Sequence, residues 1–146
     1  MPRVVPNRLR VVLGTVLVLA LAAGAAVVTR AGTGEDKPLP TSVVIDIHYS
    51  RFEPSAITVP VGMPIVITLR NHDPIDHEWI VGDDAVHAIH RVGTEPLHPD
   101  RPTEVVIPAG SEKTTIVTFA AAGQLKYICH LPGHEAYGMV GTFTIR

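Results

Sequence analysis

The sequence lacks several features, and each absence excludes a class of protein. It contains one cysteine, Cys129, so no disulfide can form within the chain. It contains thirteen prolines and no amphipathic helical run of useful length, which argues against a helical bundle. No acidic residue precedes Arg30, whereas from residue 31 onward eight basic residues face fourteen acidic ones, a balance of −6. Such an acidic domain would repel the phosphates of nucleic acid.

The N-terminal region carries no charge between residues 11 and 29, a run of nineteen residues. A helix of that length spans roughly 28 Å, close to the thickness of a bilayer core. Three arginines before the run keep the N-terminus in the cytoplasm and send the rest of the chain across. We interpret residues 1–30 as a signal peptide, cleaved near the small residues 23–25, or as a retained signal anchor. The length of the run favours the anchor.

The organisation of the remaining chain predicts one folded domain. Residues 31–41, rich in glycine, proline and charge, are typical of a linker, and residues 42–146 have the size of a Greek-key β-sandwich. Short β-branched or alternating runs between turns predict strands at residues 43–49, 56–59, 65–69, 78–81, 105–107, 114–119, 125–128 and 140–145. We therefore predict an all-β sandwich. Residues 82–102 show no strand pattern but favour a short helix at residues 84–90, with Asp83 as its cap.

A cluster of soft donor atoms lies near the C-terminus, in the pattern Cys129-x4-His134-x4-Met139. A thiolate, an imidazole and a thioether on one loop select copper over magnesium or calcium. In an exported chain a lone cysteine is oxidisable unless something holds it, and a metal is the economical explanation. One further imidazole would complete the ligands of a blue-copper electron-transfer site.

The fourth ligand must come from a histidine outside this loop. We choose His77, because it stands at the start of the strand predicted at residues 78–81, after a stretch rich in turn residues. A ligand at the lip of a strand is held by the sheet, and Cys129 also follows a strand end. Two neighbouring loops at one end of a sandwich would then converge on the metal. The other histidines considered are His48, His72, His87, His90 and His98.

Five motifs follow one another along the domain: Asn71-x5-His77, Pro108-Ala109-Gly110 before a Thr-rich strand, Gly123-x3-Tyr127-x-Cys129, Pro132-Gly133-His134 and Gly138-Met139. This order resembles that of the cupredoxin family across residues 42–146, and the final loop is most similar to those of rusticyanin and sulfocyanin. The resemblance implies one mononuclear copper ion held by His77, Cys129, His134 and Met139. It also implies an electron route through the edge of the His134 ring.

Two positions depart from the family pattern. Glu78 stands where cupredoxins often have an asparagine or serine that ties the two ligand loops together, so this tie is open. His130 follows the cysteine, where multicopper oxidases use histidine to bridge to a three-copper cluster. That cluster needs several His-x-His pairs, which this sequence lacks, and a binuclear copper site needs two cysteines. We therefore exclude both of those centres.

Other interpretations of the same residues stay open. In one alternative, Cys129 is an ordinary buried core residue. In another, it forms a nucleophile–base pair with His134, although no oxyanion loop stands out. A second metal site is an alternative role for His87, His90 and His98. The default interpretation is that these three histidines are solvated loop residues. Acidic residues near His77 would form a docking face for a basic partner or only a solvated rim; they are Asp73, Asp76, Glu78, Asp83 and Asp84.

The sequence thus predicts an extracytoplasmic blue-copper protein, in the periplasm or at the cell exterior, that carries single electrons between redox partner proteins. It would transform no substrate, so we expect it not to be an enzyme. It would not bind nucleic acid, and it would meet the membrane through residues 1–30 if these are uncleaved. The alternative is a copper-binding protein for storage, delivery or resistance, mildly favoured by the histidines of residues 82–102 and His130. A small copper enzyme with an open coordination position is a third interpretation, against which Met139 argues.

Overall fold

The computed structural model describes residues 39–93 and 101–146. Residues 1–30, most of the predicted linker and His98 lie outside the described residues, so the choice between signal peptide and anchor stays a prediction. Within the two described segments, no helix is long and apolar enough to cross a membrane.

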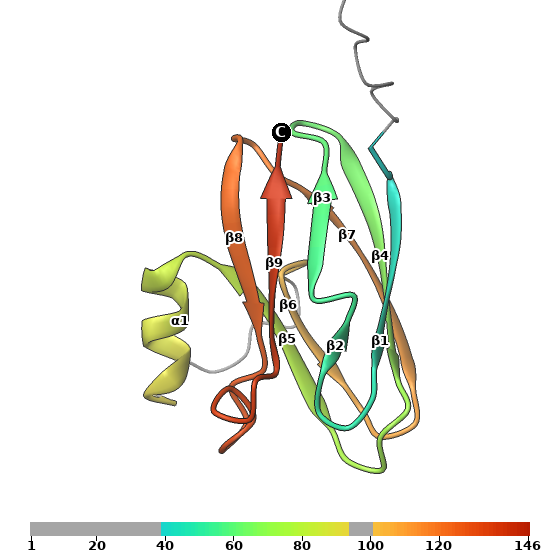
Figure 1. The fold of residues 1–146 in the computed structure, drawn as a ribbon, viewed down its shortest axis with the longest axis vertical. Coiled ribbons are helices and arrows are strands. Elements are labelled where there is room, and N and C mark those ends of the chain that lie inside the picture. The colour runs from blue at the N-terminus through green and yellow to red at the C-terminus, as the bar shows by residue number, and fades with distance from the viewer. Residues whose placement is uncertain (1–38, 94–100) are drawn as a thin grey trace, which may run out of the picture. The chain divides into compact units, whose positions relative to one another are not determined.

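The described residues form a sandwich of two β-sheets (Figure 1). One sheet has the strand order β2–β1–β4–β7, formed by Phe52–Glu53, Ser42–Ile47, Pro64–Asn71 and Glu112–Thr118. The other has the order β3–β9–β8–β5–β6, formed by Ala56–Val59, Val140–Ile145, Gly123–Ile128, His77–Gly82 and Glu104–Ile107. β1 pairs in parallel with β4, and β3 with β9, while the other pairs are antiparallel. The predicted all-β sandwich is confirmed.

The core lies between the sheets and follows from the two-residue period of the strands, which turns alternate side chains to one face. Alternate residues of β1 and β4 are buried: Val43, Ile45, Ile47, Ile65, Ile67 and Leu69. Aromatic rings pack beside them, with the ring centroids of Tyr127 and Phe143 4.9 Å apart and Trp79 edge-on to Phe143 at 6.2 Å. Because Trp79 lies on β5 and Tyr127 on β8, this packing fixes the two strands that lead to the predicted ligands.

The predicted elements agree closely with the observed ones. All eight predicted strands are present in the described residues, with ends shifted by at most two residues. The sequence missed β2, whose two residues are too few to show a period. The predicted helix is α1, Asp84–Arg91. Asp83 is its N-cap as predicted, because its Oδ1 accepts hydrogen bonds from the N–H groups of Ala85 and Val86, each at 3.0 Å.

The first strand ends earlier than predicted. Tyr49 and Ser50 have φ angles of 54° and 52°, in the left-handed region that strand residues do not adopt. Their N–H groups donate to Oδ1 and Oδ2 of Asp73, each at 2.7 Å. The prediction that the strand reaches Tyr49 is wrong, because the chain turns here onto the carboxylate of a distant residue.

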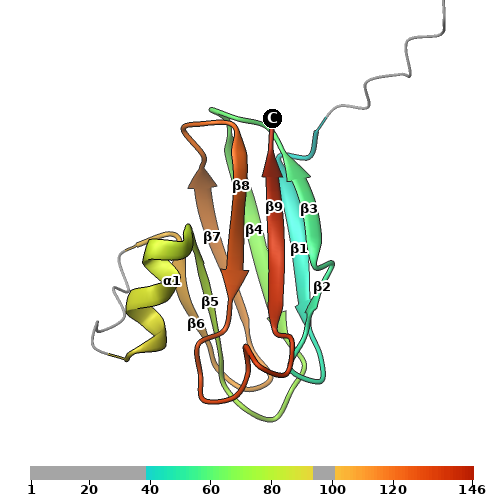
Figure 2. The same ribbon diagram turned by 60° about the vertical axis from the view of Figure 1, so that its left-hand side comes forward.

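The segments that carry the predicted ligands lie at one end of the sandwich. β5 begins at His77, β8 ends directly before Cys129, and β9 begins directly after Met139. β5 and β8 are antiparallel neighbours, so the start of one lies beside the end of the other. Figure 2 shows the loop between β8 and β9 at the same end of the sheets as the turn before β5.

Candidate metal centre

Three of the predicted ligands meet at this end of the sandwich. Nδ1 of His134 lies 3.3 Å from Nδ1 of His77 and 3.2 Å from Sγ of Cys129. The three donor atoms all lie within 4.8 Å of one another. Two imidazole nitrogens and a sulfur at these separations fit one soft metal ion between them.

His77 is fixed by a buried carboxylate. Its Nε2 lies 2.9 Å from Oδ2 of Asp73, and because a carboxylate only accepts, Nε2 carries the proton. Nδ1 of His77 therefore presents its lone pair to the other donors, as in metal sites whose histidines are held by an outer acceptor. Burial tends to raise the pKa of Asp73, but the N–H groups of Ser50 and Tyr49, together with His77, hold this pKa below its usual value.

Cys129 is fully buried and is joined to the other ligand loop. The backbone N–H of Glu78 donates to Sγ of Cys129 at 3.4 Å. The tie between the loops, left open by the sequence, therefore exists and does not depend on the side chain at position 78. Burial raises the pKa of the Cys129 thiol, against the opposing effect of hydrogen bonds from the backbone of Glu78 and Leu131. A metal ion would supply the positive charge that stabilises the thiolate.

Asn71 connects the turn before β5 to the end of β6. Its Nδ2 donor lies 2.8 Å from the carbonyl oxygen of Ile75, 3.1 Å from that of Ile107 and 3.0 Å from that of Pro108. Its Oδ1 accepts from the N–H of Asp73 at 3.0 Å. Asn71 thus positions the residue that in turn holds His77. The sequence signalled Asn71 only through the resemblance, which did not indicate what it contacts.

The loop from Cys129 to Met139 is closed by its own backbone. The N–H of Cys129 donates to the carbonyl of Met139 at 3.2 Å, and the N–H of Met139 donates to that of His134 at 3.0 Å. Gly133 and Gly138 have φ angles of 86° and 91°, which favour glycine. Met139 is fully buried, with its backbone bonded to both other ligands of the loop. Its role as the axial ligand stays a prediction.

The three donors differ in exposure. His77 and Cys129 are fully buried, whereas His134 is partly exposed. Burial lowers the pKa of His134, and His77 lowers it further, so the ring is neutral and its lone pair is available at neutral pH. Within the described residues, His134 is therefore the donor through which this centre meets the surface.

The other histidines considered lie elsewhere. His48 and His72 are exposed, and His72 pairs with Asp46 at 2.8 Å. His87 and His90 are buried, so the default interpretation of them as solvated loop residues is wrong. The second-metal hypothesis included His98, which lies outside the described residues.

A buried cysteine and two histidines at one end of a β-sandwich define the mononuclear copper centre of a cupredoxin. The family model described as copper binding proteins of the plastocyanin/azurin family matches residues 41–146. The chain belongs to this family, and its cofactor is copper. The predicted resemblance to cupredoxins is thereby confirmed.

The chain is also similar to two curated proteins, and it shares its fold with a solved structure. The chain is 33% identical over 100 residues to the copper-resistant cuproprotein CopI of Rubrivivax gelatinosus, covering 66% of this chain and 60% of that protein. It is 26% identical over 138 residues to the CopI of Pseudomonas aeruginosa, covering 72% of this chain and 76% of the relative. The dithionite-reduced auracyanin of Roseiflexus castenholzii has the same fold, with a TM-score of 0.63 at 24% identity over 75% of this chain and 99% of the other.

Proposed function

We propose that this protein is an extracytoplasmic carrier of single electrons. The observation that carries the proposal is that His77, Cys129 and His134 face one another through contacts that need no metal. When bound, copper supplies the Cu(II)/Cu(I) couple, and two imidazoles, a thiolate and a weak axial thioether suit both oxidation states. Donors that are already in place have little to move when an electron arrives.

The fixed donors are the basis of this proposal. His77 cannot turn without breaking its buried hydrogen bond to Asp73, whose carboxylate also accepts from two backbone N–H groups. Cys129 is held by the N–H of Glu78, and hydrogen bonding around the sulfur is one of the features that tune the potential of such a site. The contacts of Asp73 with His77 and of Glu78 with Cys129 involve protein atoms only, so they hold the donors in either oxidation state of the metal.

The electron would enter and leave through His134. This residue is partly exposed, and its exposed neighbours Pro132, Gly133 and Ala136 are small or compact. A redox partner can therefore approach the ring edge closely. Of the acidic residues near His77 in sequence, Asp76, Asp83 and Asp84 are exposed, whereas Asp73 is buried and Glu78 partly so. A docking face for a basic partner would draw on the three exposed ones.

Export and the absence of catalysis belong to the same proposal. The uncharged run at residues 11–29, with arginines before it, supports transfer of the domain out of the cytoplasm, with or without retention as an anchor. The thioether of the buried Met139, as a further ligand, would leave no open position for a substrate. We therefore propose that the protein is not an enzyme.

Copper handling is the second candidate function, because both curated relatives are named copper-resistant cuproproteins. The two functions make opposite demands on the site. A carrier must keep its ion in both oxidation states, whereas a delivery or resistance protein must surrender Cu(I) to an acceptor.

Redox cycling of the full chain tests the proposal. One equivalent of Cu(II) should give an intense thiolate-to-copper absorption band and an electron paramagnetic resonance (EPR) spectrum with narrow hyperfine splitting. Repeated reduction by ascorbate and reoxidation, with a Cu(I) chelator present, should restore the whole band in each cycle. A band that shrinks with each cycle, as Cu(I) passes to the chelator, would instead support delivery or resistance.

A further inference from the structure

A second group of histidine rings is buried beside the loop that carries Cys129. His87 and His90 project from α1, and His130 follows Cys129 directly. His87 is fully buried, His90 is 8% exposed, and the side chain of His130 is 3% exposed. Burying an imidazole is unfavourable unless its nitrogens find partners. None of these three rings belongs to the donor group of His77, Cys129 and His134.

The inner nitrogens of two of these rings face each other. Nδ1 of His87 lies 3.0 Å from Nε2 of His130. The outer nitrogens face acceptors, because Nε2 of His87 lies 3.1 Å from the carbonyl oxygen of Gly82 and Nδ1 of His130 lies 3.6 Å from Oε2 of Glu135. His77 is arranged in the same way, with Asp73 on its outer nitrogen. Histidines that bind metals characteristically donate their outer N–H to such acceptors.

The two protons that the neutral rings carry can be placed in two ways. With one proton between the rings and one on Nε2 of His87, the contact between the rings and the Gly82 carbonyl are both satisfied, and Nδ1 of His130, 3.6 Å from Glu135, carries none. With both protons on the outer nitrogens, two lone pairs face each other across the gap. A metal ion there would take the place of the proton between the rings. Metal–imidazole bonds are about 2.0–2.1 Å long, so nitrogens 3.0 Å apart suit one ion that binds both at nearly a right angle.

The ring of His90 lies beside these two. Its ring is stacked on that of His130, with centroids 5.7 Å apart and planes 9° from parallel. Its Nε2 is buried and makes no hydrogen bond within the described residues, and Oε1 of Glu104 lies 3.7 Å from it. A buried imidazole nitrogen without a hydrogen bond calls for an explanation, and an ion bound beside it would supply one.

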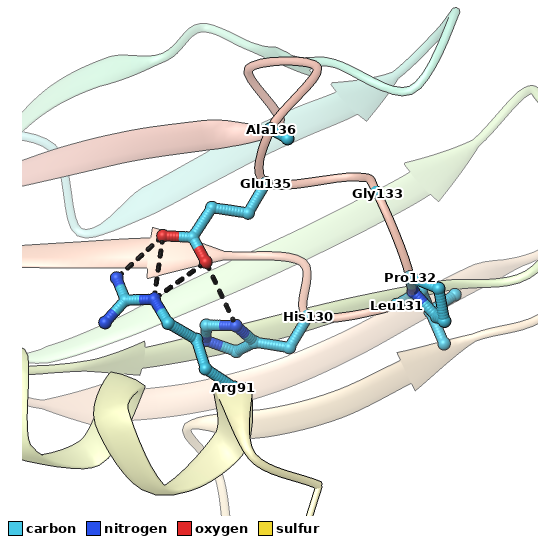
Figure 3. Close-up of a pocket in the computed structure, with 7 residues that line it drawn as sticks. All are labelled: Arg91, His130, Leu131, Pro132, Gly133, Glu135 and Ala136. Carbon is cyan, nitrogen blue, oxygen red and sulfur yellow. Dashed lines mark hydrogen bonds and ion pairs between the residues drawn. The ribbon is translucent and has the colours of Figure 1, made fainter.

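A route from solvent leads to these rings. A cavity of about 370 Å³ is lined by Arg91, His130 and Glu135, together with uncharged residues of the loop, namely Leu131, Pro132, Gly133 and Ala136 (Figure 3). Glu135 lies between two other lining residues, since it pairs with Arg91 of α1 at 2.7 Å and faces His130. An ion can therefore approach His130 without passing through the first centre.

We propose that His87 and His130, with His90 beside them, form a second copper site. An all-imidazole group suits copper or zinc, and among first-row divalent ions Cu(II) binds nitrogen ligands most tightly. The site contains no sulfur, so the ion bound there is held rather than tuned for electron transfer. Because His130 is bonded directly to Cys129, the two copper ions would sit on adjacent residues of one chain.

The test uses the full chain, purified without a histidine tag and freed of metal, with Cu(II) as the probe. The first equivalent should saturate the visible band. The second should bind without increasing that band and should give EPR with wide hyperfine splitting and coupling to two or three imidazole nitrogens. His87→Gln should lose the second ion and keep the band, which also reports that this variant is folded. His48→Gln, at an exposed histidine, is the matched control and should bind both ions.

Three results would overturn the proposal. The first is a wild-type chain that binds one copper ion. The second is a second ion that survives both His87→Gln and His90→Gln. The third is a second ion that is lost from His48→Gln or His72→Gln, which would make it an adventitious surface ion. If His87→Gln does not fold, the nitrogen coupling of the second ion in the wild type decides, because a spectrum without coupling to imidazole nitrogens contradicts the site.

Discussion

Two groups of histidines lie beside Cys129, and only one of them includes its sulfur atom. On one side, His77 and His134 face a buried sulfur; on the other, His87 and His130 face only each other. Both groups use an acceptor to fix the outer nitrogen of a ring, a carboxylate at His77 and a backbone carbonyl at His87. Both groups thus orient a histidine through an acceptor on its outer nitrogen. The presence of sulfur makes the first group suited to electron transfer, and its absence makes the second suited to holding an ion.

The difference also appears in what supports each group. The first centre is held by loops that two packed strands, β5 and β8, position at the end of the sandwich. The second depends on α1, an eight-residue helix joined to the loop by the Arg91–Glu135 ion pair. Exposed ion pairs contribute little to stability. We therefore expect some substitutions to weaken metal binding at the second group and leave binding at the first unchanged.

The largest effect should come from removing the sulfur. Cys129→Ser should abolish the intense visible band completely, because the band is a thiolate-to-copper transition. The two imidazoles of the first centre remain, so a copper ion bound there should show the wide hyperfine splitting expected of the second group. Absorption and EPR of the singly loaded protein check this. A band that persists would show that Cys129 is not a ligand.

Removing the support of His77 should come next. Asp73→Asn replaces a carboxylate that accepts from His77, Tyr49 and Ser50. Loss of such an outer partner typically lowers metal affinity by about 10–100-fold, and we expect that loss at the first centre alone. Competition titrations against a chelator, followed by the visible band, measure it. Asp46→Asn, whose carboxylate pairs with the exposed His72, is the control and should leave the affinity unchanged.

Proton competition should affect the first centre by about tenfold per pH unit. The raised pKa of Cys129 means that the free thiol is protonated at neutral pH, so copper binding must release its proton. Affinity should therefore fall by about tenfold for each unit that the pH falls near neutrality. The lowered pKa of His134 means that this ring begins to compete only at more acidic pH. Chelator titrations between pH 6 and 8 test the slope, and a flat profile would contradict a thiol in the free protein.

The axial position should tune the first centre without dismantling it. Met139→Leu keeps a buried apolar side chain but removes the thioether. Losing a donor destabilises Cu(II), the ion of higher charge, more than Cu(I), and the axial ligand is known to tune the potential of such sites. The visible band should remain and the reduction potential should rise. Protein-film voltammetry measures the shift. An unchanged potential would remove Met139 from the proposed ligands, with Met63→Leu, at an exposed position, as the reference.

The sequence predicted the first group well because its signals are local. The spacing of Cys129, His134 and Met139 lies within one loop, and His77 was chosen because it begins a strand. The contacts that fix these donors are not local. Asp73 reaches residues 23 and 24 positions away, and Glu78 contacts Cys129 through its backbone, which leaves no side-chain pattern.

The second group was only half visible in the sequence. The spacing of His87 and His90 indicated a pair on one helix, and their hypothesised partner was His98. The partner that the structure supplies is His130, 43 positions from His87. No local pattern could select it, because the choice depends on how α1 packs beside the loop after β8. The sequence placed both groups near a copper loop but could not assign His130 to the second.

The smallest effect should separate the two groups most cleanly. Asp83→Ala removes the N-cap of α1, which typically costs about 1 kcal/mol. Because α1 carries His87 and His90 but no ligand of the first centre, the variant should bind the second ion up to about fivefold more weakly. Its visible band and reduction potential should equal those of the wild type. Asp84→Ala, which removes a neighbouring exposed carboxylate but keeps the cap, should change the second affinity less. Equal losses at both centres would show that α1 supports the whole end of the sandwich rather than the second group alone.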